Sequence, residues 1–498
     1  MILRQKRLYL PGNRATESSA LARHSLSRRG WPSSLFSCLL LLCASVAPAQ
    51  TQTDCFPSGQ APPGGIPGNA TCYAGPLDSK GNITTDANGA YYLIAIPQDW
   101  NGTLFVQGHG GPDFTYVGSS KVLFSALFGA GVLLPRGYAV AATSFARQGW
   151  TQSANALDIE SLRRIFVNKF GRPKQTFVIG GSYSGGVVSK VVENFGVNAD
   201  GTKNYDGAAI GCGLLGGICH YFDAFLDLRV VYQYYCQNFP LPSETQYPLY
   251  FGYPLGINRA DITDPMEVLH RASSCTGFDL PAAQRSAQQS QNLANIQKIL
   301  RIPDDVLAAQ FANLTLPGGF ALGDFTQVDL SGRNAISNLE IHYTGSTDDD
   351  ALNKGVARYA ADRLATAWVD GDSAPVGNIH NTPVLTFHGE SDPIVFVETE
   401  SVWKDAVQSS HQLDSLLQLF VKERASDPTS PYRGHCGFTP SETTTTFDLI
   451  INWAKTGAKP TVADAQRICN SYLARSTAPH DDCRFDSNYT PRPWSSCV

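Results

Sequence analysis

A serine in a glycine-rich turn is the feature of this sequence best suited to chemistry. Ser182 lies in Gly180-Gly181-Ser182-Tyr183-Ser184-Gly185-Gly186, directly after the β-branched and aromatic run 175–179. A serine becomes a good nucleophile when a sharp strand-to-helix turn lifts its hydroxyl clear of a sheet, with the helix N-terminus behind the anion that forms. Such a turn crowds backbone against backbone, so the residues two positions before and after the serine must be small. Gly180 and Ser184 satisfy that requirement for Ser182.

Two other interpretations of this turn remain open. Ser184, flanked by Ser182 and Gly186, is a competing nucleophile. We favour Ser182 because the turn must follow the strand at once. A Gly/Ser-rich turn without catalysis, as in some phosphate loops, is the other interpretation. No Gly-Lys-Ser/Thr follows, which argues against a nucleotide site.

A second glycine-rich segment could supply an oxyanion hole. His109-Gly110-Gly111 follows the apolar, strand-like run 103–107. The oxyanion formed during acyl transfer needs about two preorganised N–H donors. We expect them from the backbone near Gly110 and Gly111 and from Tyr183, the residue after the nucleophile. A tight glycine turn with no such role is the alternative.

An acid and a base follow the serine in chain order. Asp392 comes just after the strand-like run 382–387, where it could orient an imidazole and stabilise the imidazolium. Glu390 is a weaker alternative, and Asp392 could instead cap the helix predicted over 398–407.

His435 comes later still, between Gly434 and Cys436. We favour it over His480 as the base because a glycine and a disulfide would pin its backbone.

The elements that must position these residues alternate between strand and helix. The strand-like segments are 90–97, 103–107, 137–143, 175–179, 205–211 and 382–387, and the helical ones include 154–170 and 183–195. This alternation predicts an α/β fold with a mostly parallel central sheet and helices on both faces. The chain is 498 residues long and 43% hydrophobic, which is ample for such a core.

Residues 220–375 do not follow this alternation. The stretch begins with an aromatic cluster, contains a polar helical run near 281–312, and carries the acidic segment Asp348–Asp350. We interpret it as an inserted, mainly helical lid domain, so that 50–219 and 376–498 form the catalytic domain. Residues 50–88, rich in Gly, Pro, Asn and Thr, are expected to be an irregular, disulfide-held lead-in.

The N-terminus and the cysteines both indicate export. Residues 1–34 are basic, 35–46 are apolar, and Ala47-Pro48-Ala49 fits a cleavage site, which predicts a signal peptide over 1–49. Ser27-Arg28-Arg29-Gly30-Trp31 also resembles a twin-arginine signal, although an ordinary basic region is the preferred interpretation. No later segment has the roughly 18 continuous apolar residues of a membrane span. The protein is therefore expected to be secreted, extracellular or periplasmic.

An even set of ten cysteines remains after the signal, without C-x-x-C spacing, and it predicts disulfides rather than zinc or redox chemistry. Closeness along the chain favours Cys55 with Cys72, and pairing among Cys469, Cys483 and Cys497.

Charge and spacing exclude several partners. The net charge is −5 and no basic stripe follows the first thirty residues, so nucleic acid is not an expected partner. No spacing implies a metal or an organic cofactor. Asp348–Asp350 could bind calcium, but a solvated acidic turn is the preferred interpretation. The oligomeric state is not predicted.

Taken together, the motifs resemble the α/β-hydrolase superfamily over roughly 90–215 and 380–455, in which Ser, Asp and His follow one another in this order. The serine turn is similar to the elbows of serine and prolyl carboxypeptidases. The pair His435-Cys436 resembles tannases and feruloyl esterases, which carry a second cysteine directly before the nucleophile, bonded to the one after the histidine. This chain has Gly181 at that position.

The resemblance implies a secreted serine esterase that acts on a small-molecule or polymeric ester through an acyl-enzyme. The aromatic start of the lid suggests a bulky or aromatic substrate, unless these rings only pack a lid core. A secreted serine exopeptidase, acting near proline for example, is the alternative function. A non-catalytic binding protein on the same scaffold is a third.

Overall fold

The computed structural model describes residues 70–494, except 77, 81–82, 112–128, 148, 254–264, 305–310, 312–318, 424–429 and 431. The predicted signal peptide and the proposed partner of Cys72 at position 55 lie outside these residues. Within the described part of the chain, no helix is both long and apolar enough to cross a membrane.

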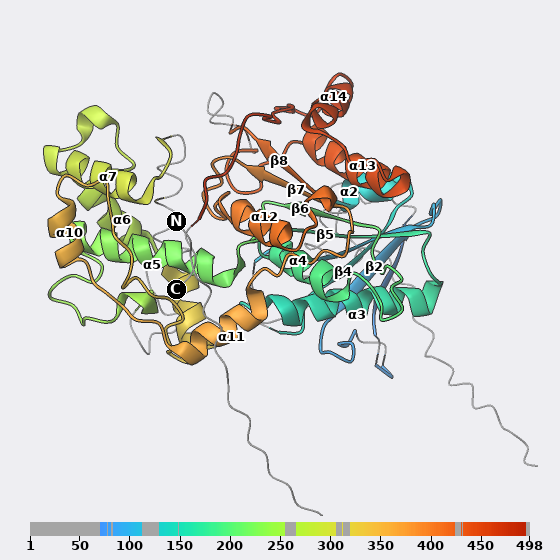
Figure 1. Ribbon diagram of the computed structural model, residues 1–498, viewed down its shortest axis with the longest axis horizontal. Helices are drawn as coiled ribbons and strands as arrows, with labels where there is room; N and C mark the ends of the chain where they lie inside the picture. Colours follow the sequence, from blue (N-terminus) through green and yellow to red (C-terminus); the bar gives the residue numbers. More distant parts are fainter. Residues whose placement is uncertain are drawn as a thin grey trace, which may run out of the picture. The chain divides into compact units, whose positions relative to one another are not determined.

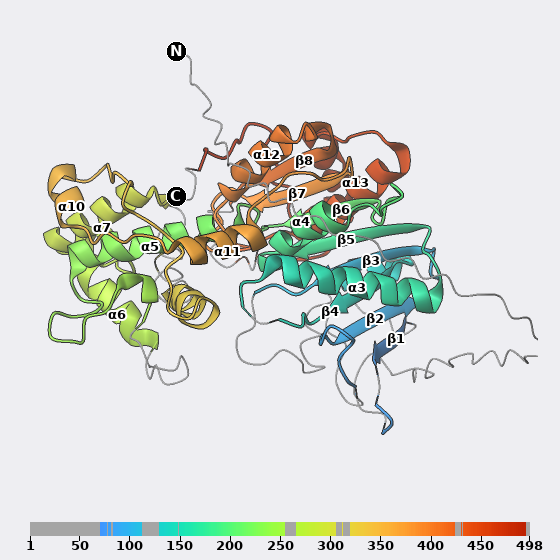
Figure 2. The ribbon, with the colours of Figure 1, turned by 60° about the horizontal axis from the view of Figure 1, so that its bottom comes forward.

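An eight-stranded sheet organises the fold (Figures 1 and 2). In spatial order its strands are β1 (Ala70–Gly75), β2 (Tyr92–Pro97), β4 (Ala139–Thr143), β3 (Thr103–Gly108), β5 (Gln175–Gly181), β6 (Gly207–Gly211), β7 (Val384–Gly389) and β8 (Leu416–Val421). β2 pairs antiparallel with β1 and β4, and all other neighbours are parallel. The predicted mostly parallel sheet is confirmed.

The two faces of the sheet bury two separate hydrophobic clusters, because successive strand side chains point to opposite faces. Leu104 and Val106 of β3 join one cluster, and Phe105 between them joins the other. The first cluster includes residues of α3 (Gln152–Phe170), α4 (Tyr183–Phe195) and α12 (Thr399–Ser409). The second includes residues of α2 (Ala130–Leu133), α13 (Pro440–Thr456) and α14 (Val462–Leu473). Helices therefore cover both faces, as predicted (Figure 2).

Between β6 and β7 the described elements are all helical, and we call residues 217–373 the insertion. Its helices are α5 (Gly217–Cys236), α6 (Pro265–Thr276), α7 (Ala287–Leu300), α9 (Gly319–Gly323), α10 (Asp349–Gly355) and α11 (Arg363–Ser373). Short helical turns complete the chain: η1 (Leu134–Arg136), η2 (Leu249–Phe251), η4 (Ala282–Gln284), η7 (Asp324–Asp329, a π-helix) and η8 (Leu413–Ser415). That the insertion acts as a lid stays a prediction.

The aromatic residues that open the insertion are part of its core. Phe222 stacks on Phe325 with ring centroids 4.2 Å apart and meets the ring of Trp150 at 5.0 Å. Phe222 and Phe225 are almost completely buried. These rings therefore pack the insertion against the first hydrophobic cluster.

Two segments differ from their sequence-based interpretation. Residues 70–75, expected to be part of an irregular lead-in, form β1 at the sheet edge, where they pair with β2. The acidic segment begins α10, where Asp348 accepts a hydrogen bond from the Ala351 N–H at 2.9 Å.

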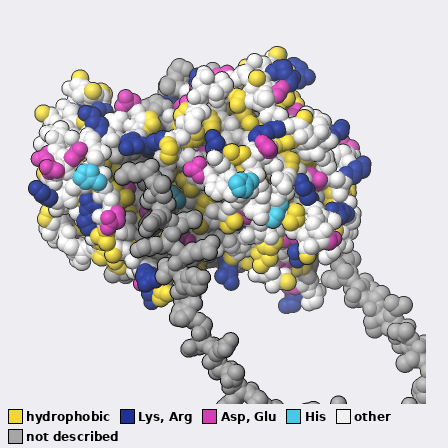
Figure 3. All heavy atoms as spheres, viewed as in Figure 1, with side chains coloured by type: hydrophobic (Ala, Val, Ile, Leu, Met, Phe, Trp, Pro, Cys, Tyr) yellow, Lys and Arg dark blue, Asp and Glu magenta, His cyan; other side chains and the backbone are white. Residues whose placement is uncertain are grey.

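On the face seen in Figure 3, Lys and Arg side chains are interspersed with Asp and Glu.

Candidate active site

The turn between β5 and α4 holds Ser182 in a strained conformation. Its φ of 56° and ψ of −129° lie outside the regions that most residues adopt. Neighbouring glycines make the turn possible. A Cβ on Gly180 would lie 2.6 Å from the Ser184 carbonyl oxygen, and one on Gly185 would lie 2.5 Å from the Gly213 Cα. Only glycine fits at either position, which is why the serine is surrounded by them.

Ser184 has a different environment from Ser182. Ser184 is buried, its Oγ donates to the Gly181 carbonyl oxygen at 3.0 Å, and it accepts from the Gly181 N–H at 3.1 Å. The Ser184 hydroxyl therefore closes the turn from inside. The Ser182 hydroxyl instead points to an imidazole.

Three loops bring Ser182, His435 and Asp392 together. His435 Nε2 lies 2.8 Å from Ser182 Oγ. His435 Nδ1 lies 3.0 Å from Asp392 Oδ1 and 2.9 Å from Oδ2. The Ser182 turn follows β5, Asp392 follows β7, and His435 lies between β8 and α13.

The weaker candidates lie elsewhere. The Glu390 N–H donates to the Val421 carbonyl oxygen and so extends the pairing of β7 with β8. His480 is exposed beyond α14. Asp392 does not cap α12, because the N-cap residue of that helix is Glu398.

Hydrogen bonds surround the buried Asp392 carboxylate. It accepts from the N–H groups of Ile394 at 2.9 Å, Val395 at 3.0 Å and Cys436 at 3.3 Å. Burial by itself would raise the pKa of Asp392, but the charge and hydrogen bond of His435, the charge of His388 and the Ile394 N–H together lower that pKa below its ordinary value. Asp392 is therefore an anion that can stabilise an imidazolium.

The predicted oxyanion-hole residues Gly110, Gly111 and Tyr183 differ in what the structure shows of their position relative to Ser182. A Cβ on Gly110 would be 3.7 Å from Ser182 Cβ, so the backbone of Gly110 approaches Ser182 closely. Gly111 has a φ of +72° and open space where a Cβ would stand. Tyr183 is the first residue of α4, where backbone N–H groups have no partner within the helix.

The Tyr183 side chain anchors this end of α4. Its buried hydroxyl accepts hydrogen bonds from the Thr151 N–H and from Asn155 Nδ2, both at 2.9 Å, and donates to the Gly149 carbonyl oxygen at 3.2 Å. Tyr183, the residue after Ser182, is thereby tied to the first turn of α3 and to the loop that precedes it.

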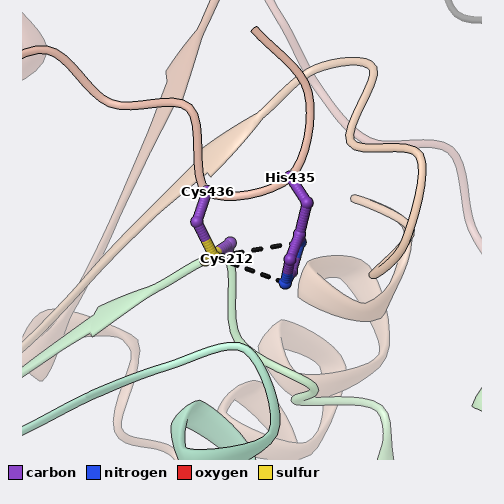
Figure 4. Close-up of side chains that lie close together, drawn as sticks. All are labelled: Cys212, His435 and Cys436. Atoms are coloured by element: carbon purple, nitrogen blue, oxygen red, sulfur yellow. Dashed lines mark hydrogen bonds between the residues drawn. A yellow bond between two sulfur atoms is a disulfide. The ribbon is translucent and has the colours of Figure 1, made fainter. Parts of the chain in front are cut away.

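A disulfide joins Cys436, the residue after the histidine, to Cys212 at the end of β6 (Figure 4). In the parallel pairing of β5 with β6, Gly181 lies opposite Gly211. A Cβ on Gly181 would consequently be 3.7 Å from Cys212 Sγ. Gly181, directly before Ser182, therefore lies beside a sulfur from the residue that follows the neighbouring strand β6.

The ligand atoms of Cys212, His435 and Cys436 lie within 4.8 Å of one another, a spacing that could suit a metal. Both sulfurs belong to the disulfide, however, and a disulfide sulfur has no thiolate to offer a metal. Cys436 Sγ lies 3.5 Å from His435 Nε2 instead. The disulfide packs against the imidazole and ties its loop to the end of β6.

Two further disulfides are described. Cys469 pairs with Cys483, as closeness predicted, and Cys236 pairs with Cys275 inside the insertion. Cys72 and Cys219 are also disulfide-bonded.

A cavity of about 360 Å³ lies on the insertion side of the Asp392 loop. Its lining comes from three places: the insertion, the loop after β7, and residues 492–494 near the C-terminus. Apolar side chains that line it include Leu228, Ile302, Phe396, Val397 and Trp494. The Arg492–Glu398 ion pair contributes charge to the same cavity.

Comparison with known proteins finds similar solved structures at low sequence identity. No family model matches the chain, and no curated protein matches it in sequence. Among solved structures it is similar to feruloyl esterase B from Aspergillus oryzae, at 15% identity over 78% of this chain and 81% of that one, with a TM-score of 0.44. Tannin acyl hydrolase from Aspergillus niger is similar at 13% identity over 79% of this chain and 79% of that one, with a TM-score of 0.40. Candida antarctica lipase A in its closed state is similar at 12% identity over 82% of this chain and 85% of that one, with a TM-score of 0.39.

The strand order and the places of the three side chains after β5, β7 and β8 decide the fold class. The chain has the α/β-hydrolase fold. The resemblance stated from the motifs is thereby confirmed at the level of fold.

Sequence reasoning missed three residues at this site: Cys212, His388 and Glu400. Cys212 directly follows the predicted strand 205–211, at the sheet edge where the other loops meet, and that placement was a usable signal. His388 and Glu400 meet only because α12 packs behind β7, and no local sequence pattern predicts that packing.

Proposed function

We propose that this protein is a secreted serine hydrolase that cleaves a carboxylic ester, with Ser182, His435 and Asp392 as its triad. The continuous hydrogen-bond chain from the Ser182 hydroxyl through His435 to Asp392 carries the proposal. It is the arrangement that lets a hydroxyl lose its proton as it attacks a carbonyl carbon.

Each group has one task in the reaction. Ser182 Oγ attacks the ester carbonyl while His435 Nε2 takes its proton, and the imidazolium then gives that proton to the leaving alcohol. The Asp392 carboxylate orients the ring and stabilises its charge. N–H groups near Gly110 and Gly111, and that of Tyr183, hold the oxyanion. Water then attacks the acyl-enzyme, His435 takes the proton of water, and the acid leaves with Ser182 restored.

The cavity beside Asp392 supports a substrate with a bulky apolar or aromatic group. Its volume of about 360 Å³ falls within the range typical of small-molecule sites. Phe396 and Trp494 in its lining could pack against such a group, while polar side chains such as Asp227 and His342 line the rest of the cavity. Secretion is supported by the disulfides, which persist in oxidising compartments.

Active-site labelling tests the nucleophile. We expect a fluorophosphonate probe to modify the wild-type protein once and to leave Ser182→Ala unmodified. Ser184→Ala is the matched control, because it removes a hydroxyl two residues away that faces the inside of the turn. Labelling of Ser182→Ala, or its loss in Ser184→Ala alone, would contradict the assignment.

Substrate preference is tested by turnover. We expect hydrolysis of p-nitrophenyl esters, with kcat/KM rising as the apolar group is enlarged, and no comparable turnover of aminoacyl amides. Faster turnover of the amides would favour an exopeptidase instead.

A further inference from the structure

Behind the triad acid lies an ionisable pair that the proposed mechanism does not use. His388 belongs to β7 and Glu400 to the first turn of α12, and both side chains are completely buried. His388 Nδ1 lies 3.2 Å from Glu400 Oε1. His388 Nε2 lies 2.9 Å from the Val395 carbonyl oxygen and 3.7 Å from Asp392 Oδ2.

The surroundings of His388 favour its protonated form. Each ring nitrogen faces an oxygen that only accepts hydrogen bonds, a carboxylate on one side and a carbonyl on the other. A neutral imidazole donates from one nitrogen alone, and its other lone pair would then face an oxygen in a buried site. Burial by itself lowers the pKa of His388, but Glu400 and Asp392 outweigh burial and raise that pKa above its ordinary value.

Glu400 is held as the partner of this imidazolium. It accepts hydrogen bonds from Thr386 Oγ1 at 2.7 Å and from Gln418 Nε2 at 2.6 Å. Glu400 from α12 and Asp392 from the loop after β7 are the charged groups that face His388. The buried charges therefore alternate in sign: Glu400, His388, Asp392 and, during the reaction, His435.

We propose that His388 is a positioning residue of the triad: its imidazolium, anchored by Glu400, balances the charge of Asp392 and weakens the hold of His435 on a proton. This proposal rests on the proposed function, because it holds that the His388–Glu400 pair lowers the pH above which His435 can act as the base. An anion that faces one cation stabilises that cation more than an anion shared between two.

Substitution of either member of the pair tests the proposal. His388→Gln removes the cation and keeps an amide that can donate to the Val395 carbonyl. We expect the acidic limb of kcat/KM for a p-nitrophenyl ester to move to higher pH, by about half a unit or more. Glu400→Gln removes the anchor, so that His388 loses its proton, and should move the limb in the same direction. The double variant should match Glu400→Gln, because in both of them the cation at position 388 and the anion at position 400 are lost together.

Thr386→Val is the matched control. It deletes a buried hydrogen bond to the same Glu400 without changing any charge. Its unfolding free energy should fall while the acidic limb stays in place. A limb that is unmoved or lowered in His388→Gln overturns the proposal, and Glu400→Gln carries the same test if His388→Gln does not fold.

A measurement without catalysis separates this idea from the proposed function. Protein labelled with ¹⁵N-histidine and carrying Ser182→Ala can be titrated by NMR with and without His388→Gln. We expect the midpoint of the His435 titration to rise when His388 is replaced, and an unchanged midpoint overturns the proposal. Absence of ester hydrolysis in the wild-type protein would count against the proposed function alone.

Discussion

At the scale of single residues, the site depends on glycines, which have no side chain, around Ser182. The backbone of Ser182 adopts an unfavourable conformation, and surrounding contacts must impose it. Gly180 lets the first turn of α4 fold back onto β5, because any Cβ there would meet the Ser184 carbonyl. The absence of a methyl group thus decides where the Ser182 hydroxyl points.

Gly180→Ala should therefore disturb the site more than the fold. We expect the unfolding free energy to fall by about 1–3 kcal/mol, as in other overpacked positions. Activity on esters should fall by roughly a hundredfold, because a small displacement of a nucleophile is enough for such a loss. Urea unfolding and ester turnover measure the two effects.

Gly371→Ala is the control for this substitution. Gly371 lies in α11, where an added Cβ meets nothing within 4 Å. The unfolding free energy should rise by about 0.5–1 kcal/mol with activity unchanged. Equal effects of the two substitutions would show that crowding at Gly180 is not what matters.

At the scale of elements, local patterns predicted most of the sheet but not its edges. Runs such as 103–107 and 175–179 were recognisable because both of their faces are buried, and they form β3 and β5. β1 was missed because its strand is defined by pairing with β2 across a loop, not by its own composition. β8 was not identified either, although Leu416–Val421 is an apolar run.

The candidate site likewise contains residues that local patterns could predict and residues that they could not. Ser182, Asp392 and His435 could be selected because each follows a segment with a recognisable pattern. The partner of Cys436 could not, because it depends on the register that sets Gly181 opposite Gly211. Among the described residues, pairing by closeness along the chain is confirmed for Cys469 and Cys483, which are 14 residues apart, whereas Cys55 lies outside them.

The Cys212–Cys436 disulfide should matter to both stability and activity. The double variant Cys212→Ala/Cys436→Ala should lower the unfolding free energy by about 2–5 kcal/mol. We also expect kcat to fall more than KM rises, because Cys436 has a φ of +54° and fixes the backbone next to His435. Denaturant unfolding and steady-state kinetics give the two results.

Cys469→Ala/Cys483→Ala serves as the comparison. Its loop is far shorter than the 224-residue separation of the other pair, so its effect on stability should be smaller. Its kcat should be unchanged. Equal losses of kcat in both double variants would mean that general destabilisation, not the loop of His435, explains the result.

At the scale of the whole molecule, carboxylates from the insertion hold the segment that supports the Ser182 turn. Asp329 accepts from the Trp150 N–H at 2.9 Å, and Asp372 accepts from the Gln152 N–H at 2.7 Å. The same loop bonds the hydroxyl of Tyr183. The insertion therefore contributes directly to the support of the turn that carries Ser182.

This attachment should depend on pH. Burial, helped by the nearby charges of Asp324 and Asp372, raises the pKa of Asp329 from 3.8 to about 7. Between those values the folded protein retains a proton that the unfolded chain has lost, so this group's contribution to stability is complete at low pH and is lost as pH rises through 7.

Asp329→Asn removes the ionisation and keeps an acceptor for the Trp150 N–H. Relative to wild type, the variant should gain stability as the pH is raised from about 4 to 7. The exposed Asp279→Asn, also in the insertion, should show no such trend. Chemical denaturation at several pH values measures the difference, and parallel curves for wild type and Asp329→Asn would refute the expectation.

The Cys212–Cys436 bond also makes a ring of the chain, because the whole insertion together with β7 and β8 lies between its two ends. A protease that cuts the backbone once anywhere in that ring produces two polypeptides that remain one covalent molecule. On a reducing gel the nicked protein would give two bands, and on a non-reducing gel a single one. His435 would stay fastened to the end of β6 in that two-chain form.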